Sequence, residues 1–446
     1  MTRTLEPQLL DAGMTPAAAA RKAATFRELL AAIGSGEPSP HIYHVPGRLE
    51  VLGKHTDYAG GRSIVAAVEQ GFAVVAAARD DGVLNIRDLA AGEVVEFPAD
   101  PDLQPTQGTW ANYPMTVARR VARNFPGPLR GADILFSSDL PVAAGMSSSS
   151  ALMIACFMVL SGVNQLAQHD EYRANITSCE QLASYLAAIE NGQSFGTLRG
   201  NHGVGTFGGS EDHTAILCSR AGHLSQYNFA PTRREQAFPV PDEYVFAIAA
   251  SGVVAEKTRA AREKYNLISR RTAEIVALWR RETGRDDATL AAAVRSAADA
   301  PDRLRAILAS HRDEALVRRL DQFIEESERI IPAFADAARG FALGGVEVGE
   351  LVDRSQALAE THLMNQVPQT IALARAAREQ GATAASAFGA GFGGSVWALV
   401  RREQGDAFIE AWSRRYAAAF PIEARQARFF LTAAASAAVK LAAHAG

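Results

Sequence analysis

The sequence predicts an α+β protein of two domains. The chain has 446 residues, of which 48% are hydrophobic, and this is enough to bury two substantial cores. Short β-rich segments and long helical segments alternate in two clusters along the chain. Between the clusters lies a polar stretch that is interrupted by Pro231, Pro239 and Pro241. We therefore predict a first domain over residues 1–230 and a second over residues 231–446.

The first half of the chain predicts a helix followed by a sheet. Thr15 and Pro16 resemble a helix cap and first turn, and the Ala-rich stretch that follows runs to Ile33, before Gly34. Short β-rich runs and helical spacing then follow in order. The predicted strands are residues 63–68, 72–78, 84–88 and 132–136, and the predicted helices are residues 111–123, 148–160 and 170–191.

The second half begins with a strand and is mainly helical. Residues 244–250 are apolar enough for a buried strand, and long helical patterns fill residues 254–335. Near the end, residues 384–388 and 395–400 predict two strands around a glycine loop, and residues 403–418 predict a helix.

Composition excludes several classes of partner. The formal net charge of −4 provides no general basic field for nucleic acid or an anionic membrane. The longest apolar run, residues 151–160, is too short to cross a bilayer. The first ten residues lack the basic and apolar regions of a secretion signal, so we expect a cytoplasmic protein. The three cysteines lack metal-ligand spacing and are expected to be small buried residues. The sequence gives no signal for the oligomeric state.

A loop of small residues leads directly into an apolar helix at Pro141–Ala151. Gly145 permits close approach of the backbone to an anion, and the first free N–H groups of the helix favour a phosphate. The hydroxyls of Ser147, Ser148, Ser149 and Ser150 add donors and a possible metal ligand. A helix cap is the structural alternative, but a cap needs one serine rather than four.

A second motif, Pro46–Gly61, places charged and polar side chains between glycines. Its members include Arg48, Lys54, His55 and Asp57. Unpaired charges are costly in a core, so these side chains either face water or converge on a polar ligand. A third motif, Gly389–Ser395, lies between two predicted strands and permits either a tight turn or a close backbone contact with a ligand.

In their order and spacing, the three motifs resemble those of the GHMP kinases, and residues 47–61 resemble the galactokinase signature. The resemblance implies an amino-terminal domain like ribosomal protein S5 and a ferredoxin-like carboxy-terminal domain, with the active site between them. It implies ATP and Mg²⁺ as cofactors and a small sugar as substrate. Trp110 resembles the family's adenine-side segment, and Tyr265 resembles its sugar-side tyrosine.

The resemblance also implies individual roles. The segment Gly208–His213 resembles the family's Gly-x-x-Asp-Gln motif, so Asp212 would be the catalytic carboxylate and Gly209 a backbone contact to the sugar. Arg48 would offset charge on the transferred phosphoryl group. Sugar ligands would include His55 and Asp57. Magnesium would be held by Ser149 and by Glu190, which lies in a segment similar to the family's Ala-Glu-His.

Several positions depart from the galactokinase pattern. His213 replaces Gln, and an extra loop, Ser194–Gly203, separates Glu190 from Asp212. Lys54 stands where galactokinases have a Glu that contacts the C6 hydroxyl, and an ammonium there would also accept a sugar with a C6 carboxylate. Three functions stay open at this point: a galactose 1-kinase, a kinase for another sugar such as a uronic acid, and a non-catalytic sensor of sugar and ATP.

Overall fold

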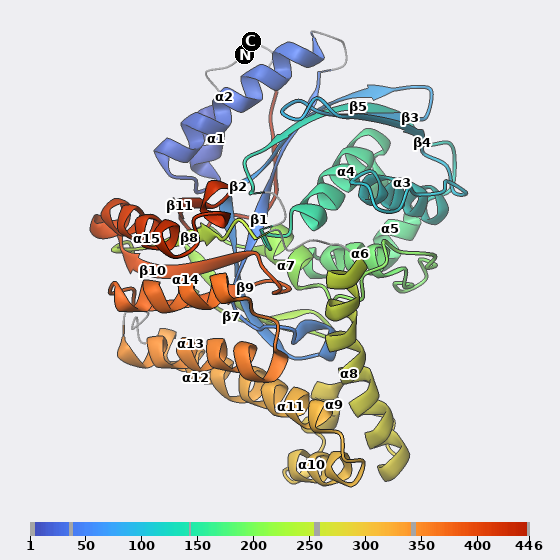
Figure 1. The fold of residues 1–446 in the computed structure, drawn as a ribbon. Coiled ribbons are helices and arrows are strands. Elements are labelled where there is room, and N and C mark those ends of the chain that lie inside the picture. The colour runs from blue at the N-terminus through green and yellow to red at the C-terminus, as the bar shows by residue number, and fades with distance from the viewer. Residues whose placement is uncertain (1–4, 35–38, 142–143, 254–258, 340–344, 444–446) are drawn as a thin grey trace.

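The computed structural model describes residues 5–34, 39–141, 144–253, 259–339 and 345–443, and it contains two sheets with helices packed on them (Figure 1). The predicted α+β class is confirmed. Residues 254–258 of the predicted helical stretch and residues 142–143 of the first motif, Pro141–Ala151, which we call the serine loop, lie outside the described residues. Among the described helices, none is both long and apolar enough to cross a membrane.

The first sheet has eight strands. Six follow the order β12-β1-β2-β5-β3-β4, and β6 pairs with β2 and with β7. The strands are β1 (His41–Leu52), β2 (Arg62–Arg79), β3 (Val83–Asp88), β4 (Val94–Pro98), β5 (Gly131–Ser138), β6 (His223–Asn228), β7 (Arg233–Pro239) and β12 (Val439–Leu441). Strands β7 and β12 lie beyond residue 230, so this sheet draws on both predicted domains. The boundary at residue 230 stays a prediction.

The strand β2 replaces two predicted strands. It continues through Gly71, where β1 and β2 come very close together. A side chain at this position would lie 2.3 Å from the Val45 carbonyl oxygen of β1, and glycine has none. The pairing of β1 and β2 shifts register between Pro46 and Arg48, beside this close approach. The second motif therefore begins on a distorted part of β1.

Helices cover both faces of the first sheet (Figure 1). One face carries α1 (Leu5–Asp11) and α2 (Pro16–Ile33), and the other carries α3 (Asn112–Asn124), α4 (Ser148–Asn164), α6 (Cys179–Asn191) and α7 (Glu211–Cys218). The predicted helix over residues 170–191 is divided into α5 (Asp170–Asn175) and α6, because Ser178 is extended and its Oγ caps the Gln181 N–H at 3.2 Å.

The second sheet has the order β11-β8-β10-β9 and is antiparallel. Its strands are β8 (Tyr244–Ala250), β9 (Ala384–Phe388), β10 (Ser395–Arg401) and β11 (Arg428–Thr432). Its helices are α13 (Val346–Leu358), α14 (Pro368–Glu379) and α15 (Gly405–Ala419). The other helical segments are α8 (Arg259–Thr283), α9 (Leu290–Val294), α10 (Ala300–Ser310), α11 (Glu314–Phe323), the π-helix η4 (Ile324–Ile330), α12 (Ile331–Arg339) and the π-helix η5 (Ala359–Leu363).

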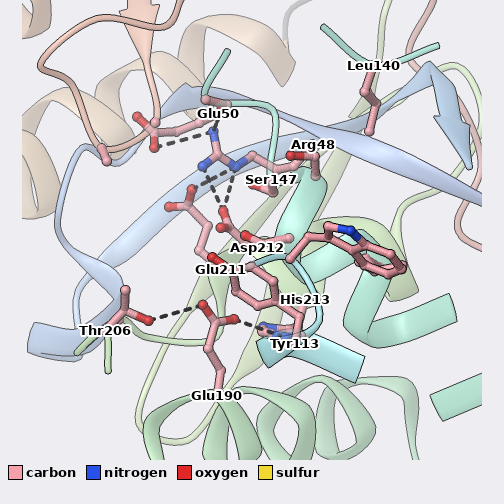
Figure 2. Close-up of a pocket in the computed structure, with 18 of the residues that line it drawn as sticks. Arg48, Glu50, Tyr113, Leu140, Ser147, Glu190, Thr206, Glu211, Asp212 and His213 are labelled. Carbon is pink, nitrogen blue, oxygen red and sulfur yellow. Dashed lines mark hydrogen bonds and ion pairs between the residues drawn. The ribbon is translucent and has the colours of Figure 1, made fainter. Parts of the chain in front are cut away.

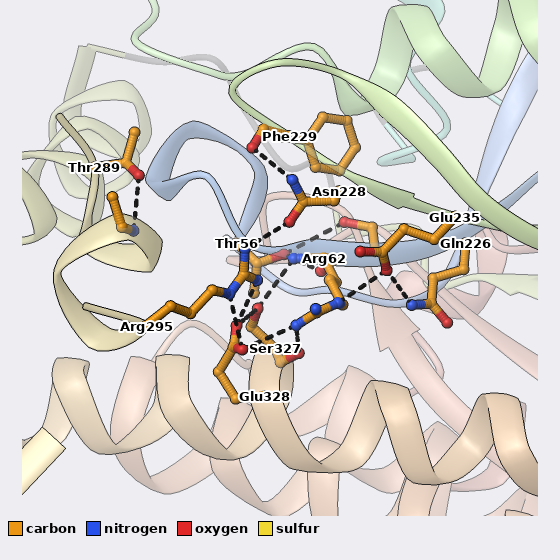
Figure 3. A network of polar contacts seen from close by, with 12 residues as sticks. Thr56, Arg62, Gln226, Asn228, Phe229, Glu235, Thr289, Arg295, Ser327 and Glu328 are labelled. Atoms are coloured by element: carbon orange, nitrogen blue, oxygen red, sulfur yellow. Dashed lines mark hydrogen bonds and ion pairs between the residues drawn. The ribbon is translucent and has the colours of Figure 1, made fainter. Parts of the chain in front are cut away.

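A polar network joins the first sheet to the helical region (Figure 3). Arg62 of β2 pairs with Glu235 of β7 and with Glu328 of η4, each at 2.9 Å. Glu328 also pairs with Arg295 at 2.7 Å, and Arg295 donates to Asn228 of β6 at 2.8 Å. The network therefore holds η4 against the end of the first sheet, next to the second motif.

Candidate active site

A cavity of about 1040 Å³ brings the three motifs together. Its wall includes Arg48 of the second motif, Gly145 of the first and the segment Gly389–Phe392 of the third. The motifs also contact one another directly. Arg48 Nη1 donates to the Gly145 carbonyl oxygen at 3.2 Å, and a side chain at Gly389 would meet that same oxygen at 2.8 Å. The third motif therefore supports the serine loop through a close backbone contact.

The serine loop leads into α4 as predicted. Gly145 has φ of 71°, and Ser147, the residue before α4, is also left-handed with φ of 59°. This backbone places Ser147, Ser148 and Ser149 on the cavity wall at the amino end of α4. Free N–H groups and the helix dipole favour an anion there.

Arg48 and Asp212 form the central ion pair (Figure 2). Arg48 is buried on β1, and its Nε donates to Asp212 Oδ1 at 2.7 Å. Asp212 lies in the first turn of α7 and lines the cavity. Burial opposes ionisation of Asp212, but the Arg48 guanidinium outweighs it and holds the pKa of Asp212 below its usual value. Asp212 is therefore an ionised carboxylate.

Two further carboxyl groups surround Arg48 and were not singled out from the sequence. Glu50 lies 3.9 Å and Glu211 lies 3.7 Å from the guanidinium, and both are buried. Burial raises the pKa of both groups, and that of Glu211 rises well above its usual value. Side chains alternate between the two faces of a strand, so Glu50 lies on the same face of β1 as Arg48. The period of the strand could therefore have indicated Glu50 as a site residue.

One end of the cavity is lined by His55, Asp57, Gly209 and Tyr265, which the sequence predicted as sugar ligands. Gly209 has no room for a side chain, because a Cβ there would lie 2.3 Å from Asp57 Oδ2. His55 Nε2 donates to the Ala390 carbonyl oxygen at 3.1 Å, and Nδ1 accepts from Tyr58 Oη at 2.9 Å. Burial lowers the pKa of His55 to about 3, so the ring is neutral.

Lys54 and Ser150 are predicted ligands that the structure does not place on the cavity wall; Ser150 is buried in the first turn of α4 and donates to Glu190, and Lys54 lies behind the wall. Lys54 is 1% exposed, and its Nζ donates to Ser355 Oγ at 3.0 Å. Ser355 in turn donates to Glu326 Oε1 at 2.9 Å. A buried ammonium needs polar partners, and Ser355 and Glu326 supply them behind the cavity wall. Because Ser355 and Glu326 are remote from Lys54 in sequence, the sequence did not indicate this arrangement.

Another part of the cavity wall is aromatic. Trp110 lines the cavity and packs edge-on against Phe136, with ring centroids 5.9 Å apart. Phe72 and Tyr113 also line the cavity. Flat apolar walls next to a helix amino terminus suit a ring that carries phosphates. The sequence identified Trp110 but not Phe72.

A set of oxygen donors lies beside the serine loop (Figure 2). Glu190, near the end of α6, lines the cavity together with Ser149 and Thr206. Glu190 accepts from Ser150 Oγ at 3.3 Å and from Thr206 Oγ1 at 3.2 Å. Burial lowers the pKa of nearby His213, which is therefore neutral and adds no positive charge. Carboxylate and hydroxyl oxygens are donors that fit Mg²⁺.

Family models match three parts of the chain. The galactokinase galactose-binding signature matches residues 31–78, the GHMP kinases N terminal domain matches residues 112–199, and the GHMP kinases C terminal domain matches residues 342–418. The chain belongs to the GHMP kinase family. The three matches contain Arg48, the serine loop and the Gly-rich third motif in turn, so the predicted resemblance is confirmed.

Relatives of this GHMP kinase include galactokinases over most of the chain. The galactokinase of Chloroflexus aggregans is 29% identical and the alignment covers 86% of this chain and 89% of the relative. The galactokinase of Enterococcus faecalis is 26% identical, with 85% and 91% covered. The structure of Lactococcus lactis galactokinase complexed with galactose has a TM-score of 0.77 at 23% identity, with 95% and 100% covered. The mevalonate kinase of L. major has a TM-score of 0.53 at 15% identity, with 91% and 97% covered.

Proposed function

We propose that this chain is an ATP-dependent sugar kinase that transfers the γ-phosphoryl group of ATP to the anomeric hydroxyl of galactose. The observation that carries the proposal is the Arg48–Asp212 pair, which lies between the serine loop and the predicted sugar ligands in a single cavity. The galactose-binding signature over residues 31–78 and the galactokinase relatives support galactose as the sugar.

The reaction follows from the positions of these groups. Asp212 orients the attacking hydroxyl and accepts its proton as the bond to phosphorus forms. Arg48 lies on the phosphate side, and its fixed positive charge stabilises charge on the transferred phosphoryl group. Asp57 and Tyr265 bind sugar hydroxyls, and Trp110 packs on the adenine ring. His55 shapes the sugar-binding part of the cavity wall through its bonds to Ala390 and Tyr58.

Magnesium is proposed as the metal cofactor, held by Ser149 and Glu190. When bound, it would neutralise negative charge on the phosphate oxygens. Glu190→Gln replaces a carboxylate with a poorer ligand, so the variant should need severalfold more Mg²⁺ for half-maximal rate. An unchanged Mg²⁺ dependence would remove Glu190 from the metal site.

A neutral hexose fits the cavity better than a uronic acid. Asp212, which Arg48 holds in the ionised form, lines the cavity and would repel a substrate carboxylate. Lys54, which would have attracted that carboxylate, is engaged with Ser355.

An assay of ADP release with galactose, glucose and galacturonate tests the proposal. We expect galactose to have the highest kcat/KM, with ADP and galactose 1-phosphate formed in equal amounts. Preference for galacturonate would contradict the assigned sugar. Binding of ATP and galactose without ADP release would instead support the sensor function.

A further inference from the structure

Cys179 and Cys218 are 39 positions apart in sequence but adjacent in the fold. Cys179 is the first residue of α6, and Cys218 is the last residue of α7. The two Sγ atoms and a carboxylate oxygen of Glu180 all lie within 4.8 Å of one another. The third cysteine of the chain, Cys156, is buried in α4 and belongs to the main core.

The two thiols have different environments. Cys179 is exposed, whereas Cys218 is buried in a small cluster with Val65 and Tyr227. A hydrogen bond from the Cys218 thiol lowers the pKa of Cys179, and it outweighs burial and the Glu180 carboxylate, which accepts from Cys179 Sγ at 3.3 Å and raises that pKa. The amino end of α6 also favours the thiolate. The neighbouring thiolate and burial raise the pKa of Cys218. An accessible, acidic thiol thus lies beside a buried thiol that can resolve its oxidation.

We propose that Cys179 and Cys218 form a reversible oxidation site, in which hydrogen peroxide converts the two thiols to an intramolecular disulfide. The Cys179 thiolate attacks one peroxide oxygen, the O–O bond breaks, and a sulfenic acid forms with loss of water. Cys218 sulfur then attacks the sulfenic sulfur, and a second water leaves as the S–S bond forms. Two thiols lose two electrons and two protons in total, and one hydrogen peroxide becomes two waters.

The disulfide would link two helices that carry site residues at their far ends. Glu190 lies near the carboxy end of α6, and Asp212 lies in the first turn of α7. The proposal does not depend on the kinase function, because it rests on the two thiols alone. A thiophilic cation such as Zn²⁺, bound by the two thiolates and Glu180, is the competing occupant of this cluster.

The experiment treats the full chain with one equivalent of hydrogen peroxide and then titrates thiols after denaturation. We expect the count to fall from three to one per chain, a Cys179–Cys218 disulfide in the peptide mass map, and full recovery with dithiothreitol. In the Cys156→Ala variant, the thiol count should fall from two to none. Cys179→Ser, which changes an exposed side chain and preserves the core, should keep both of its thiols.

Three results would overturn the proposal. One is oxidation of Cys179 to a sulfinic acid with Cys218 still reduced. Another is a disulfide between two chains in place of the internal one. The third is stoichiometric Zn²⁺ in the purified protein, together with the absence of an internal disulfide when the chelated protein is treated with peroxide. In Cys218→Ala, a dimedone probe should trap the sulfenic acid on Cys179, and failure to trap it would remove the first step.

Discussion

Arg48 is a single positive charge among three carboxyl groups, and its distances of 3.9 Å to Glu50, 3.7 Å to Glu211 and 2.7 Å to Asp212 identify Asp212 as its partner. Burial raises the pKa of Glu50 and Glu211, whereas contact with Arg48 holds that of Asp212 below its usual value. The guanidinium therefore pairs with Asp212 as the anion, at 2.7 Å. This arrangement keeps an ionised carboxylate in a largely buried site.

Asp212→Asn should reduce kcat by about 10²–10⁴-fold, because an amide keeps the shape of the side chain but cannot accept a proton. The KM for galactose and the dissociation constant of ATP should change by about threefold at most. Steady-state kinetics and calorimetry measure these quantities. A variant that retains most of its kcat would show that Asp212 is not the catalytic carboxylate.

Lys54→Glu should destabilise the protein rather than change its sugar preference. The substitution places a carboxylate beside Ser355 and Glu326, both fully or almost fully buried, and exchanges attraction for repulsion. We expect the free energy of unfolding in urea to fall by about 3–5 kcal/mol. The matched control combines Lys54→Met with Glu326→Gln, which removes both charges together and should cost less. A stable Lys54→Glu enzyme with selectively altered use of C6-modified sugars would return Lys54 to the sugar site.

At the scale of elements, α11 and the π-helix η4 hold the backbone of the second motif. Glu326 Oε1 accepts from the Gly53 N–H at 2.8 Å, and Gln322 Nε2 donates to the Lys54 carbonyl oxygen at 3.1 Å. Arg319 donates to the His55 carbonyl oxygen, and Ser327 Oγ accepts from the Arg62 N–H at 3.0 Å. Four side chains of residues 319–327 thus fix the loop that carries His55 and Asp57. π-Helical turns frequently occur at such functional positions.

Glu326→Ala should raise the KM for galactose about tenfold while the KM for ATP stays nearly unchanged. The variant leaves the buried Gly53 N–H without its acceptor, so the loop that carries His55 and Asp57 loses a fixed position, whereas the Trp110–Phe136 pair does not involve Glu326. Glu326→Gln retains an acceptor oxygen and should restore most of the galactose affinity. Glu325→Ala, the neighbouring position that pairs with Arg354 on the surface, is the control and should leave both KM values near those of the parent.

Equal increases in both KM values, or no rescue by Glu326→Gln, would indicate a general loss of structure. In that case η4 would have no specific role in positioning the loop that carries His55 and Asp57.

At the scale of the whole molecule, Glu328 connects the helical region to the first sheet through Arg62 and Arg295 (Figure 3). Burial alone would raise the pKa of Glu328, but its hydrogen bond from Arg295 and the charges of both arginines hold the pKa below its usual value. A depressed pKa in the folded state means that the folded protein favours the ionised form. The stabilisation is present above the ordinary carboxyl pKa and is lost as the pH falls through the lower, folded-state value.

Glu328→Gln should therefore lower the free energy of unfolding by about 1–3 kcal/mol at pH 7. The difference from the parent should shrink as the pH falls below about 4.3, where the parent's carboxyl begins to protonate in the unfolded state. Urea unfolding curves between pH 3 and pH 7 measure this. A difference that stays constant with pH would mean that the charge of Glu328 does not contribute.

The amino-acid sequence alone predicted the α+β class, the family resemblance and residues of all three motifs that line the cavity. Residues 244–250 and 384–388 form strands with the predicted bounds, and the helix from Pro16 to Ile33 also matches. These features depend on local physics: side-chain period, caps and glycine positions are written within a few neighbouring residues. The motifs around Arg48, Gly145 and Asp212 were recognisable because each is a short continuous segment.

The tertiary structure decided which of these residues share an environment. It turned Lys54 away from the cavity toward Ser355 and Glu326, which are 301 and 272 positions distant. It also brought Cys179 next to Cys218 and gathered Glu50 and Glu211 around Arg48. Burial and pairing depend on contacts between segments remote in sequence, and the energy of a charge depends on those contacts. A single sequence specifies the charge of Lys54, but the fold supplies the partners that decide where that charge lies.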